Sequence, residues 1–435
     1  MEKETLLQLL FNHPQVKQLA DVFSKKSVKR IFAEGLCASS ASMYFSALAH
    51  NGKKLPPVLF LLNDMDEAGY FFHDLSQMVG EENVLFFPSS YRRAIKYNQK
   101  DAANSILRTE VLSRIGVQSH SKNPLFVVSY PEAVAEKVVS KNELESNTLV
   151  LKVGGVADVT LLEKKLFELG FHRTDYVYEP GQFAIRGSII DIFSYSSENP
   201  FRIDFFGDEI DSIRSFDVQS QLSVDKVESV SVVPEMDTSE SDYVPFLDFL
   251  PDDMVLAVSD LTFVCDKVSK VYDEGFSTQA LAEEKASHDM MRRKGESVES
   301  SFTDMYDGSM NSVQVIRDHT IVSGEEFCRS VLKMRRVEFG VHPTDKADVI
   351  VSFKTSPQPL FHKNFDMLSS ELSRLIAEGY KVNILADSDK QIARLKDIFA
   401  EINVSYKELR SKELRSKELR SKELGSEGSC EIRFE

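Results

Sequence analysis

The chain has 435 residues, of which 42% are hydrophobic and 28% are charged, and its formal net charge is −16. This composition indicates an ordinary globular protein, and its length suggests about two to four domains. The negative charge excludes broad adhesion to DNA or anionic membranes, because both require an excess of Lys and Arg. No signal peptide or apolar run of about 18 residues is present, and the cysteines have no metal-binding or disulfide spacing. We therefore expect a soluble cytoplasmic protein with reduced cysteines: Cys37, Cys265, Cys328 and Cys430.

Residues 1–147 alternate short apolar runs with amphipathic helices. The runs are VKRIFAEG, PVLFLLNDM, NVLFFPSS and PLFVVSYP, and helices are predicted at 66–79 and 102–115. Continuous apolar runs separated by helices are typical of a mostly parallel sheet that is covered on both faces. Residues 1–147 therefore predict the first part of an α/β domain.

Residues 148–233 have a different pattern, which predicts a small inserted α+β domain. The segment ADVTLLEKKLFELG predicts a helix with a Thr160–Glu163 capping box, a stop at Gly170, and one apolar face made by Leu162, Leu166 and Leu169. Period-two alternation follows in QFAIRGSIIDIFS and PFRIDFFGDEIDSI, and Gly207-Asp208 predicts a two-residue hairpin turn.

Residues 234–350 predict the second part of the first α/β domain, because PFLDFLPDDMVLAVSD contains a buried strand that can rejoin the sheet. Residues 351–435 predict a further α/β domain, truncated at CEIRFE, with a helix in DMLSSELSRLIAEG, a strand in KVNILA and a helix capped by Ser388. In the five-residue repeat at 407–424, successive leucines step by about 140° around a helix and form no stripe. A solvated helix and a disordered insertion both remain open for this repeat.

The segment EGLCASSAS lies between an apolar run and a helix, where a phosphate-binding loop would lie. A functional loop reads G-x-x-x-x-G-K-[ST], with a lysine that reaches the phosphates and a hydroxyl that binds magnesium. This chain has Gly35, Ser40, Ala41 and Ser42 in that frame, so the second glycine and the lysine are missing. We therefore predict a plain strand-to-helix turn that binds nucleotide poorly.

Residues 171–217 contain FHRTDYVYEPGQFAIRGSIIDIFS and PFRIDFFGDEIDSIRSFD. This segment resembles one that is shared by the excision-repair protein UvrB and by the N-terminal part of the transcription-repair coupling factors. The resemblance implies a RecA-like parallel-sheet domain that carries a small inserted domain. In UvrB-like motors the strand after an FPDD-type turn ends in an Asp-Glu pair, whereas Ser259 and Asp260 stand at those positions here. Asp260 is more consistent with a cap at the end of the strand.

The two altered motifs imply that this chain has no ATPase activity and no bound cofactor. In the intact family protein, ATP and magnesium act in a motor that would lie beyond residue 435. The loop after NVLFFPSS mixes aromatic and basic residues, as single-strand-binding platforms do, but a solvated surface is the favoured interpretation for so short a group: Tyr91, Arg92, Arg93, Lys96 and Tyr97.

The resemblance also implies that the inserted domain docks UvrA, with Arg173 and Arg186 at the positions of two anchoring arginines. Ala184 stands where UvrB has a further arginine, which would make this interface less dependent on charge. Alternation along QFAIRGSIIDIF predicts that Arg186 lies with Ala184 and Ser188 on the face opposite the main core, which takes Phe183, Ile185, Ile189 and Phe193.

An exposed guanidinium on that face can bind a partner carboxylate through two hydrogen bonds. An internal ion pair of Arg186 with Asp175, Glu179 or Asp191 is an equally open alternative. Arg202 and Arg214 are predicted to form cross-strand charge pairs.

The function implied by the resemblance is recruitment of UvrA to RNA polymerase stalled at DNA damage. Polymerase and double-stranded DNA would be contacted by C-terminal domains that these 435 residues do not include. Two other hypotheses remain open: a divergent but active UvrB-like ATP-dependent helicase, and an interaction scaffold without a role in repair.

Overall fold

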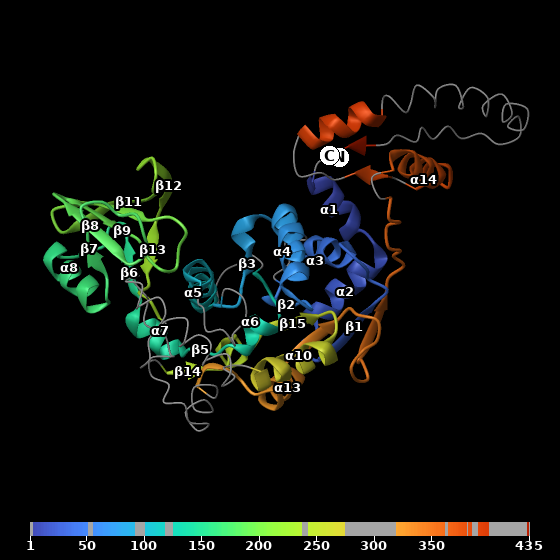
Figure 1. Ribbon diagram of the computed structural model, residues 1–435, viewed down its shortest axis with the longest axis horizontal. Helices are drawn as coiled ribbons and strands as arrows, with labels where there is room; N and C mark the ends of the chain where they lie inside the picture. The colour runs from blue at the N-terminus through green and yellow to red at the C-terminus, as the bar shows by residue number, and fades with distance from the viewer. Residues whose placement is uncertain are drawn as a thin grey trace, which may run out of the picture. The chain divides into compact units, whose positions relative to one another are not determined.

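The structure is a computed structural model that describes residues 3–50, 55–91, 101–117, 125–236, 242–274, 319–361, 364–380, 382–384, 390–399 and 433–434. The chain divides into two compact units. One comprises Met1–Leu10 and Ser356–Glu435, and the other comprises Phe11–Thr355. The second unit contains both a seven-stranded and a six-stranded sheet (Figure 1).

The seven-stranded sheet is parallel throughout and has the strand order β17-β1-β16-β15-β2-β4-β3. Four strands precede the small sheet in the chain: β1 (Arg30–Glu34), β2 (Val58–Leu61), β3 (Val84–Phe86) and β4 (Phe126–Ser129). Three follow it: β15 (Val255–Val258), β16 (Arg335–Glu338) and β17 (Val349–Ser352). Every residue of β2, β4 and β15 is buried, as expected for strands covered on both faces. The predicted return of the chain to the first sheet is confirmed, because β15 lies between β16 and β2.

Helices cover both faces of this sheet (Figure 1). On one face α3 (Ser40–His50) packs against α4 (Met65–Val79), and on the other α10 (Leu261–Glu274) packs against α13 (Gly324–Lys333). The helices predicted at 66–79 and 102–115 are confirmed as α4 and α5 (Ala102–Val117). The remaining elements are shorter or peripheral: α2 (Pro14–Ser24), η1 (Glu81–Asn83), α6 (Pro131–Ala135), α7 (Lys141–Asn147), α9 (Phe246–Phe249), and the paired strands β5 (Val138–Val139) and β14 (Tyr243–Val244).

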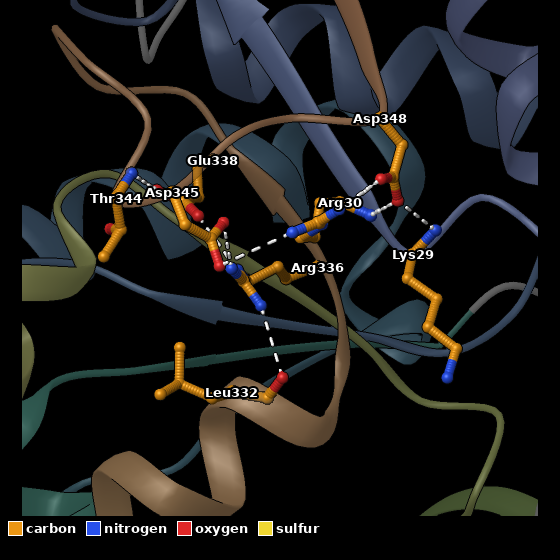
Figure 2. Close-up of polar contacts among 8 residues, drawn as sticks. All are labelled: Lys29, Arg30, Leu332, Arg336, Glu338, Thr344, Asp345 and Asp348. Atoms are coloured by element: carbon orange, nitrogen blue, oxygen red, sulfur yellow. Dashed lines mark hydrogen bonds and ion pairs between the residues drawn. The ribbon is translucent and has the colours of Figure 1, made fainter.

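Residues 339–348 lead from β16 to the parallel strand β17 without a helix. Figure 2 shows how buried Arg336 holds this connection: it donates hydrogen bonds to Glu338 Oε1 at 2.9 Å and to Asp345 Oδ1 at 2.5 Å. The other oxygen of Glu338 accepts the Thr344 amide at 2.7 Å. The connection is therefore fixed to β16 by charge-assisted hydrogen bonds, which are stronger than neutral ones.

The start of β17 is fixed to β1 by Asp348 (Figure 2). Its Oδ1 accepts from Arg30 Nη2 at 2.6 Å and Nε at 3.2 Å, and its Oδ2 accepts the amides of Lys29 and Arg30. The Arg30 side chain and these amides lower the pKa of Asp348 to about 2, since all of them favour the carboxylate. The edge strand β17 is thus joined to its neighbour by side chains as well as by the sheet.

The six-stranded sheet has the order β12-β11-β10-β9-β8-β7. Its strands are β7 (His172–Arg173), β8 (Gln182–Arg186), β9 (Ile189–Ile192), β10 (Phe201–Phe206), β11 (Glu209–Phe216) and β12 (Ser223–Val227). One face packs with α8 (Val159–Glu168) around buried side chains that include Leu162, Leu166, Phe183, Ile190 and Ile192. Two further strands, β6 (Leu149–Lys152) and β13 (Ser229–Val232), pair with each other and bring together the two ends of this segment.

The α/β fold with a RecA-like parallel sheet and a small second sheet is confirmed. The predicted hairpin at Gly207-Asp208 is confirmed as well, because Phe206 and Glu209 are register partners. The apolar face of α8 is correct, and Gly170 follows the helix with φ of +81°.

The predicted capping box of α8 is wrong. Asp158 is the N-cap, and its Oδ1 accepts the amides of Thr160 at 2.7 Å and Leu161 at 3.1 Å. Thr160 is the second residue of the helix, so its own amide is one of the first-turn amides that need a cap. Glu163 instead forms an ion pair with Arg173.

The predicted alternation along QFAIRGSIIDIF is only half correct. Gly187 and Ser188 form a turn between β8 and β9, so Arg186 and Ile189 are register partners on the same face. Ile190 and Ile192 join the main core in place of Ile189, and Phe193 lies in a smaller cluster on the other face with Val177, Ala184, Phe216 and Val218. The two-residue loop shifts the phase of the alternation, because Arg186 and Ile189 are three positions apart in the sequence and yet lie on the same face.

The other compact unit contains α14 (Phe365–Ala377) and a parallel pair formed by β18 (Asn383–Ile384) and β19 (Arg433–Phe434), and α1 (Lys3–Phe11) begins in it. Among the described residues, no helix is both long and apolar enough to span a membrane. Several sequence-based predictions lie outside the described residues: the cap at Ser388, the repeat at 407–424, and the basic or aromatic residues Arg92, Arg93, Lys96 and Tyr97.

Candidate functional sites

The loop from Gly35 to Ser39 connects β1 to α3 and occupies the position of a nucleotide loop. Gly35 has φ of +80°, and a Cβ atom there would lie 2.3 Å from the carbonyl oxygen of Phe353. Only glycine fits so close to the chain that leaves β17. Thr355 Oγ1 lies 2.5 Å from the Gly35 carbonyl oxygen and donates a hydrogen bond to it. The start of the loop is therefore packed against neighbouring backbone.

The other three residues of the nucleotide-like frame, Ser40, Ala41 and Ser42, are buried or form hydrogen bonds within the protein. Ser40 Oγ accepts the Cys37 amide at 2.8 Å and donates to the Cys37 carbonyl at 2.6 Å. Ala41 is 3% exposed. Ser42 Oγ lies 2.9 Å from both the Ser39 carbonyl and Asp74 Oδ2. The Ser42 hydroxyl is therefore bonded within the protein to a carbonyl and a carboxylate.

The second motif lies at the end of β15, with β16 between it and β1 in the sheet. Ser259 Oγ hydrogen-bonds to Asn63 Oδ1 at 3.1 Å, and Asp260 Oδ1 accepts the Phe263 amide at 2.9 Å. Asp260 therefore caps the first turn of α10. Among the described residues, no group of three or more His, Cys, Asp or Glu side chains is arranged to hold a metal ion. At both motifs the side-chain oxygens of the serines and of Asp260 form hydrogen bonds within the chain.

Arg186 lies at the end of β8, and its side chain is 34% exposed. Its Nη2 forms an ion pair with Asp191 Oδ2, and its Nη1 donates to the Asp175 carbonyl at 3.3 Å. The guanidinium carbon lies 5.0 Å from the centre of the Tyr176 ring, within the range of a cation–π contact. Of the alternatives left open by the sequence, the structure shows the internal pair with Asp191, while part of the guanidinium still faces solvent.

Asp191 is fully buried and shared by two arginines. Besides Arg186 it accepts from Arg202 Nε at 2.8 Å and from Arg202 Nη2 at 2.9 Å. These hydrogen bonds raise the pKa of Arg202. A buried carboxylate needs such partners, because burying it unpaired would be costly. Asp191 therefore fixes the position of Arg186 from within the sheet.

The face that carries Arg186 holds a row of charged side chains across neighbouring strands. Asp191, Arg202, Arg214 and Lys226 are successive register partners from β9 to β12. Arg214 forms an ion pair with Asp204 on β10. The predicted cross-strand charge pairs of Arg202 and Arg214 are confirmed.

Arg173 lies on β7 and forms an ion pair with Glu163 Oε1 of α8 at 2.6 Å. Because α8 covers the face that takes Phe183, Arg173 lies toward that face, whereas Arg186 alternates to the other. The structure therefore does not bring the two predicted arginines together on one face. They lie at the two ends of the loop formed by residues 174–181 and the strand that follows it.

Two exposed tyrosines in the loop before β8 were not among the predicted site residues. Tyr176 is 52% exposed and Tyr178 is 57% exposed, although both flank the buried residue Val177. The alternation Y-V-Y was a usable signal, since it places two aromatic rings on one side. Tyr91, which the favoured interpretation placed on a solvated surface, is instead buried.

Residues 149–237, which include the six-stranded sheet, match the family described as the UvrB interaction domain. The curated relatives include the transcription-repair-coupling factor of Bacillus subtilis (strain 168), 31% identical over 210 residues, which are 48% of this chain and 17% of the relative. The transcription-repair-coupling factor of Staphylococcus aureus (strain USA300) is 24% identical over 395 residues, covering 80% of this chain and 32% of the relative.

These matches confirm the resemblance to the UvrB-like N-terminal module of the transcription-repair coupling factors. The matched regions span about a third or less of the relatives' own length. The activity of a whole coupling factor is therefore not assigned to this chain by similarity alone.

Proposed function

We propose that this chain is the UvrA-binding module of a transcription-repair coupling factor. Its role is to bring UvrA to RNA polymerase stalled at DNA damage. The observation that carries the proposal is the match of residues 149–237 to the UvrB interaction domain, which contains the partly exposed Arg186.

The chemistry of Arg186 supports this role. A guanidinium has five N–H donors, and Arg186 uses one nitrogen for Asp191 and one for the Asp175 carbonyl. Because 34% of the side chain is exposed, the donors not used in these bonds suit a carboxylate of the partner, and Arg and carboxylate groups are matched in shape. Ala184 leaves strand β8 without a second arginine two residues before Arg186, so the contact depends less on charge than it would with both.

The same proposal assigns no ATPase activity and no cofactor to this chain. Internal hydrogen bonds at Ser40 and Ser42, the buried Ala41, and the capping role of Asp260 all support it. ATP, magnesium, polymerase and double-stranded DNA are assigned to other parts of the intact coupling factor.

Isothermal titration of the chain with purified UvrA tests the proposal. We expect saturable binding, weakened by the pair of substitutions Arg173→Ala and Arg186→Ala. The matched control is Arg329→Ala on α13, which removes an exposed arginine with an ion-paired glutamate but leaves the inserted domain unchanged. Absence of binding by the wild-type chain rejects the proposed function. ATP hydrolysis above background favours the alternative, a divergent UvrB-like helicase.

A further inference from the structure

The loop of residues 174–181 presents two aromatic rings on the surface of the inserted domain. Tyr176 and Tyr178 are more than half exposed, and Val177 between them is fully buried. Val177 packs in a small cluster with Ala184, Phe193 and Phe216, on the same face of the sheet as Arg186. The loop is therefore anchored by one apolar side chain while the two tyrosines on either side point outward.

Hydrogen bonds fix the backbone of this loop. Thr174 Oγ1 donates to the Tyr176 carbonyl at 2.8 Å. Gln182 Oε1 accepts the amides of Tyr178 at 2.9 Å and Glu179 at 3.2 Å. A loop held in this way loses little conformational entropy when a partner binds, which favours affinity. Tyrosine adds to this advantage because it offers a large contact area with only two side-chain torsions.

Tyr176 and Arg186 form one continuous surface. The guanidinium lies over the Tyr176 ring at 5.0 Å, and the neighbouring Asp175 carbonyl accepts from Arg186 Nη1. The ring therefore holds the arginine on one side, while buried Asp191 holds it from the other. Exposed tyrosine and arginine together are the residue types most enriched among energetically important interface positions.

We propose that Tyr176 and Tyr178 form the aromatic half of the UvrA contact and that Arg186 forms its charged half. UvrA then presents a carboxylate to Arg186 beside an apolar recess that takes the two rings. This inference rests on the proposed function and adds to it two residues and the chemistry of the partner surface. Tyr176 has a second role, since it also positions Arg186.

Titration of UvrA into four single variants of the full chain tests the inference. We expect Tyr178→Ala and Tyr176→Ala to weaken binding by about 5–30-fold, as truncation of an anchoring aromatic residue does. Tyr176→Phe keeps the ring and is expected to bind within about threefold of wild type, because the cation–π contact remains. The control is Tyr70→Ala on α4, which removes a 77% exposed tyrosine outside the inserted domain and leaves the affinity unchanged.

The thermal unfolding midpoints of the tyrosine variants should match that of wild type, since both rings are largely in solvent. If Tyr176→Ala fails to fold, Tyr178→Ala still tests the inference, because Tyr178 does not contact Arg186 in the described contacts. Wild-type affinity in Tyr178→Ala and Tyr176→Ala, combined with weaker binding of Arg186→Ala, overturns the aromatic half and leaves the proposed function intact. No binding by any variant, wild type included, rejects the proposed function itself.

Discussion

The nucleotide-like loop (residues 35–42) and the segment that carries Arg186 (residues 174–186) both hold their polar side chains by internal hydrogen bonds, but they differ in how far those side chains are exposed. At residues 35–42, each polar side chain of the frame bonds to a neighbouring residue, and Ala41 is buried. At residues 174–186, Asp191 and the loop backbone hold Arg186 and two tyrosines in place while leaving them partly in solvent. In the first region, internal hydrogen bonds occupy the polar groups of the frame. In the second region, they hold side chains in position while leaving them partly exposed to a partner.

This difference shows that motif position alone does not decide whether a residue is available to a ligand. Ser42 keeps the hydroxyl of a phosphate loop, yet Asp74 and the Ser39 carbonyl surround it. Arg186 is internally paired, yet a guanidinium has more donors than its partners use. Substitution of residues such as Ser42 should change the stability of the fold, whereas substitution of residues such as Arg186 should change the binding of a partner.

The largest effect is expected for Asp191→Ala. This change leaves Arg186 and Arg202 without their shared buried carboxylate, and removing one partner of a buried ion pair costs about 3–5 kcal/mol. Urea unfolding should show this loss, whereas Asp225→Ala on the exposed strand β12 should change stability by about 0.5 kcal/mol or less. Equal unfolding midpoints for wild type and Asp191→Ala would contradict the role given to Asp191.

Two glycines with positive φ lie in turns that differ in packing: Gly35 lies against neighbouring backbone, whereas Gly187 faces open space. Gly187→Ala places a Cβ in open space at φ of +62° and should cost about 1–2 kcal/mol. Gly35→Ala adds a clash with the Phe353 carbonyl and should cost about 1–3 kcal/mol more. Denaturant unfolding of both variants measures the difference, and equal costs would mean that the loop after β1 is less tightly packed than described.

Restoring the phosphate-loop residues should not restore nucleotide binding. The double change Ser40→Gly and Ala41→Lys buries a larger, charged side chain and removes the hydroxyl that bonds Cys37, so stability should fall by about 1–3 kcal/mol. A fluorescent ATP analogue should show no saturable binding, as in wild type. Tight binding by this variant would show that the loop is open to phosphate.

The Arg30–Asp348 pair should contribute a pH-dependent stability. The folded pKa of Asp348 is lowered from 3.8 to about 2, so its contribution is present above pH 4 and is lost as pH falls from about 4 to about 2. Asp348→Asn should therefore unfold earlier than wild type at pH 6, and the gap should narrow toward pH 2. A gap that stays constant over this interval would exclude the assigned role of the carboxylate.

A small change in stability is expected for Arg173→Ala. Its pair with Glu163 is half exposed to solvent, and exposed pairs contribute about 0–1 kcal/mol. Thermal unfolding of this variant should nearly coincide with that of wild type. A larger loss of stability would show that Arg173 stabilises the fold and is not only a surface residue.

The sequence predicted the elements whose signals are local. Apolar runs located β1, β2, β4 and β15, because parallel strands covered on both faces leave no alternation to misread. Capping and turn positions were less secure. Asp158 and Thr160 are both suitable N-caps by residue type, and only the start of the helix in three dimensions distinguishes them.

The surroundings of Arg186 were predictable only in part, because they depend on how β8 and β9 are aligned. The sequence offered three acidic partners for Arg186, and the turn at Gly187-Ser188 decided for Asp191 by setting which strand positions face each other. The same register separates Arg173 from the face of Arg186. A short acidic interruption in the apolar strand SIIDIF was the signal that Asp191 must have buried partners.

The pairing of β6 with β13 has a consequence for the order of events during synthesis. The inserted segment has all of its strands once residue 232 has left the ribosome, whereas the parallel sheet still lacks β15, β16 and β17 at that time. Because domains generally fold as units during translation, we expect the inserted segment to fold first. The strands of the parallel sheet that precede it in the chain would fold later, when β15, β16 and β17 are available. Nascent chains stopped soon after residue 232 has emerged from the ribosome would then resist protease within 149–232 while their first 147 residues were still cleaved.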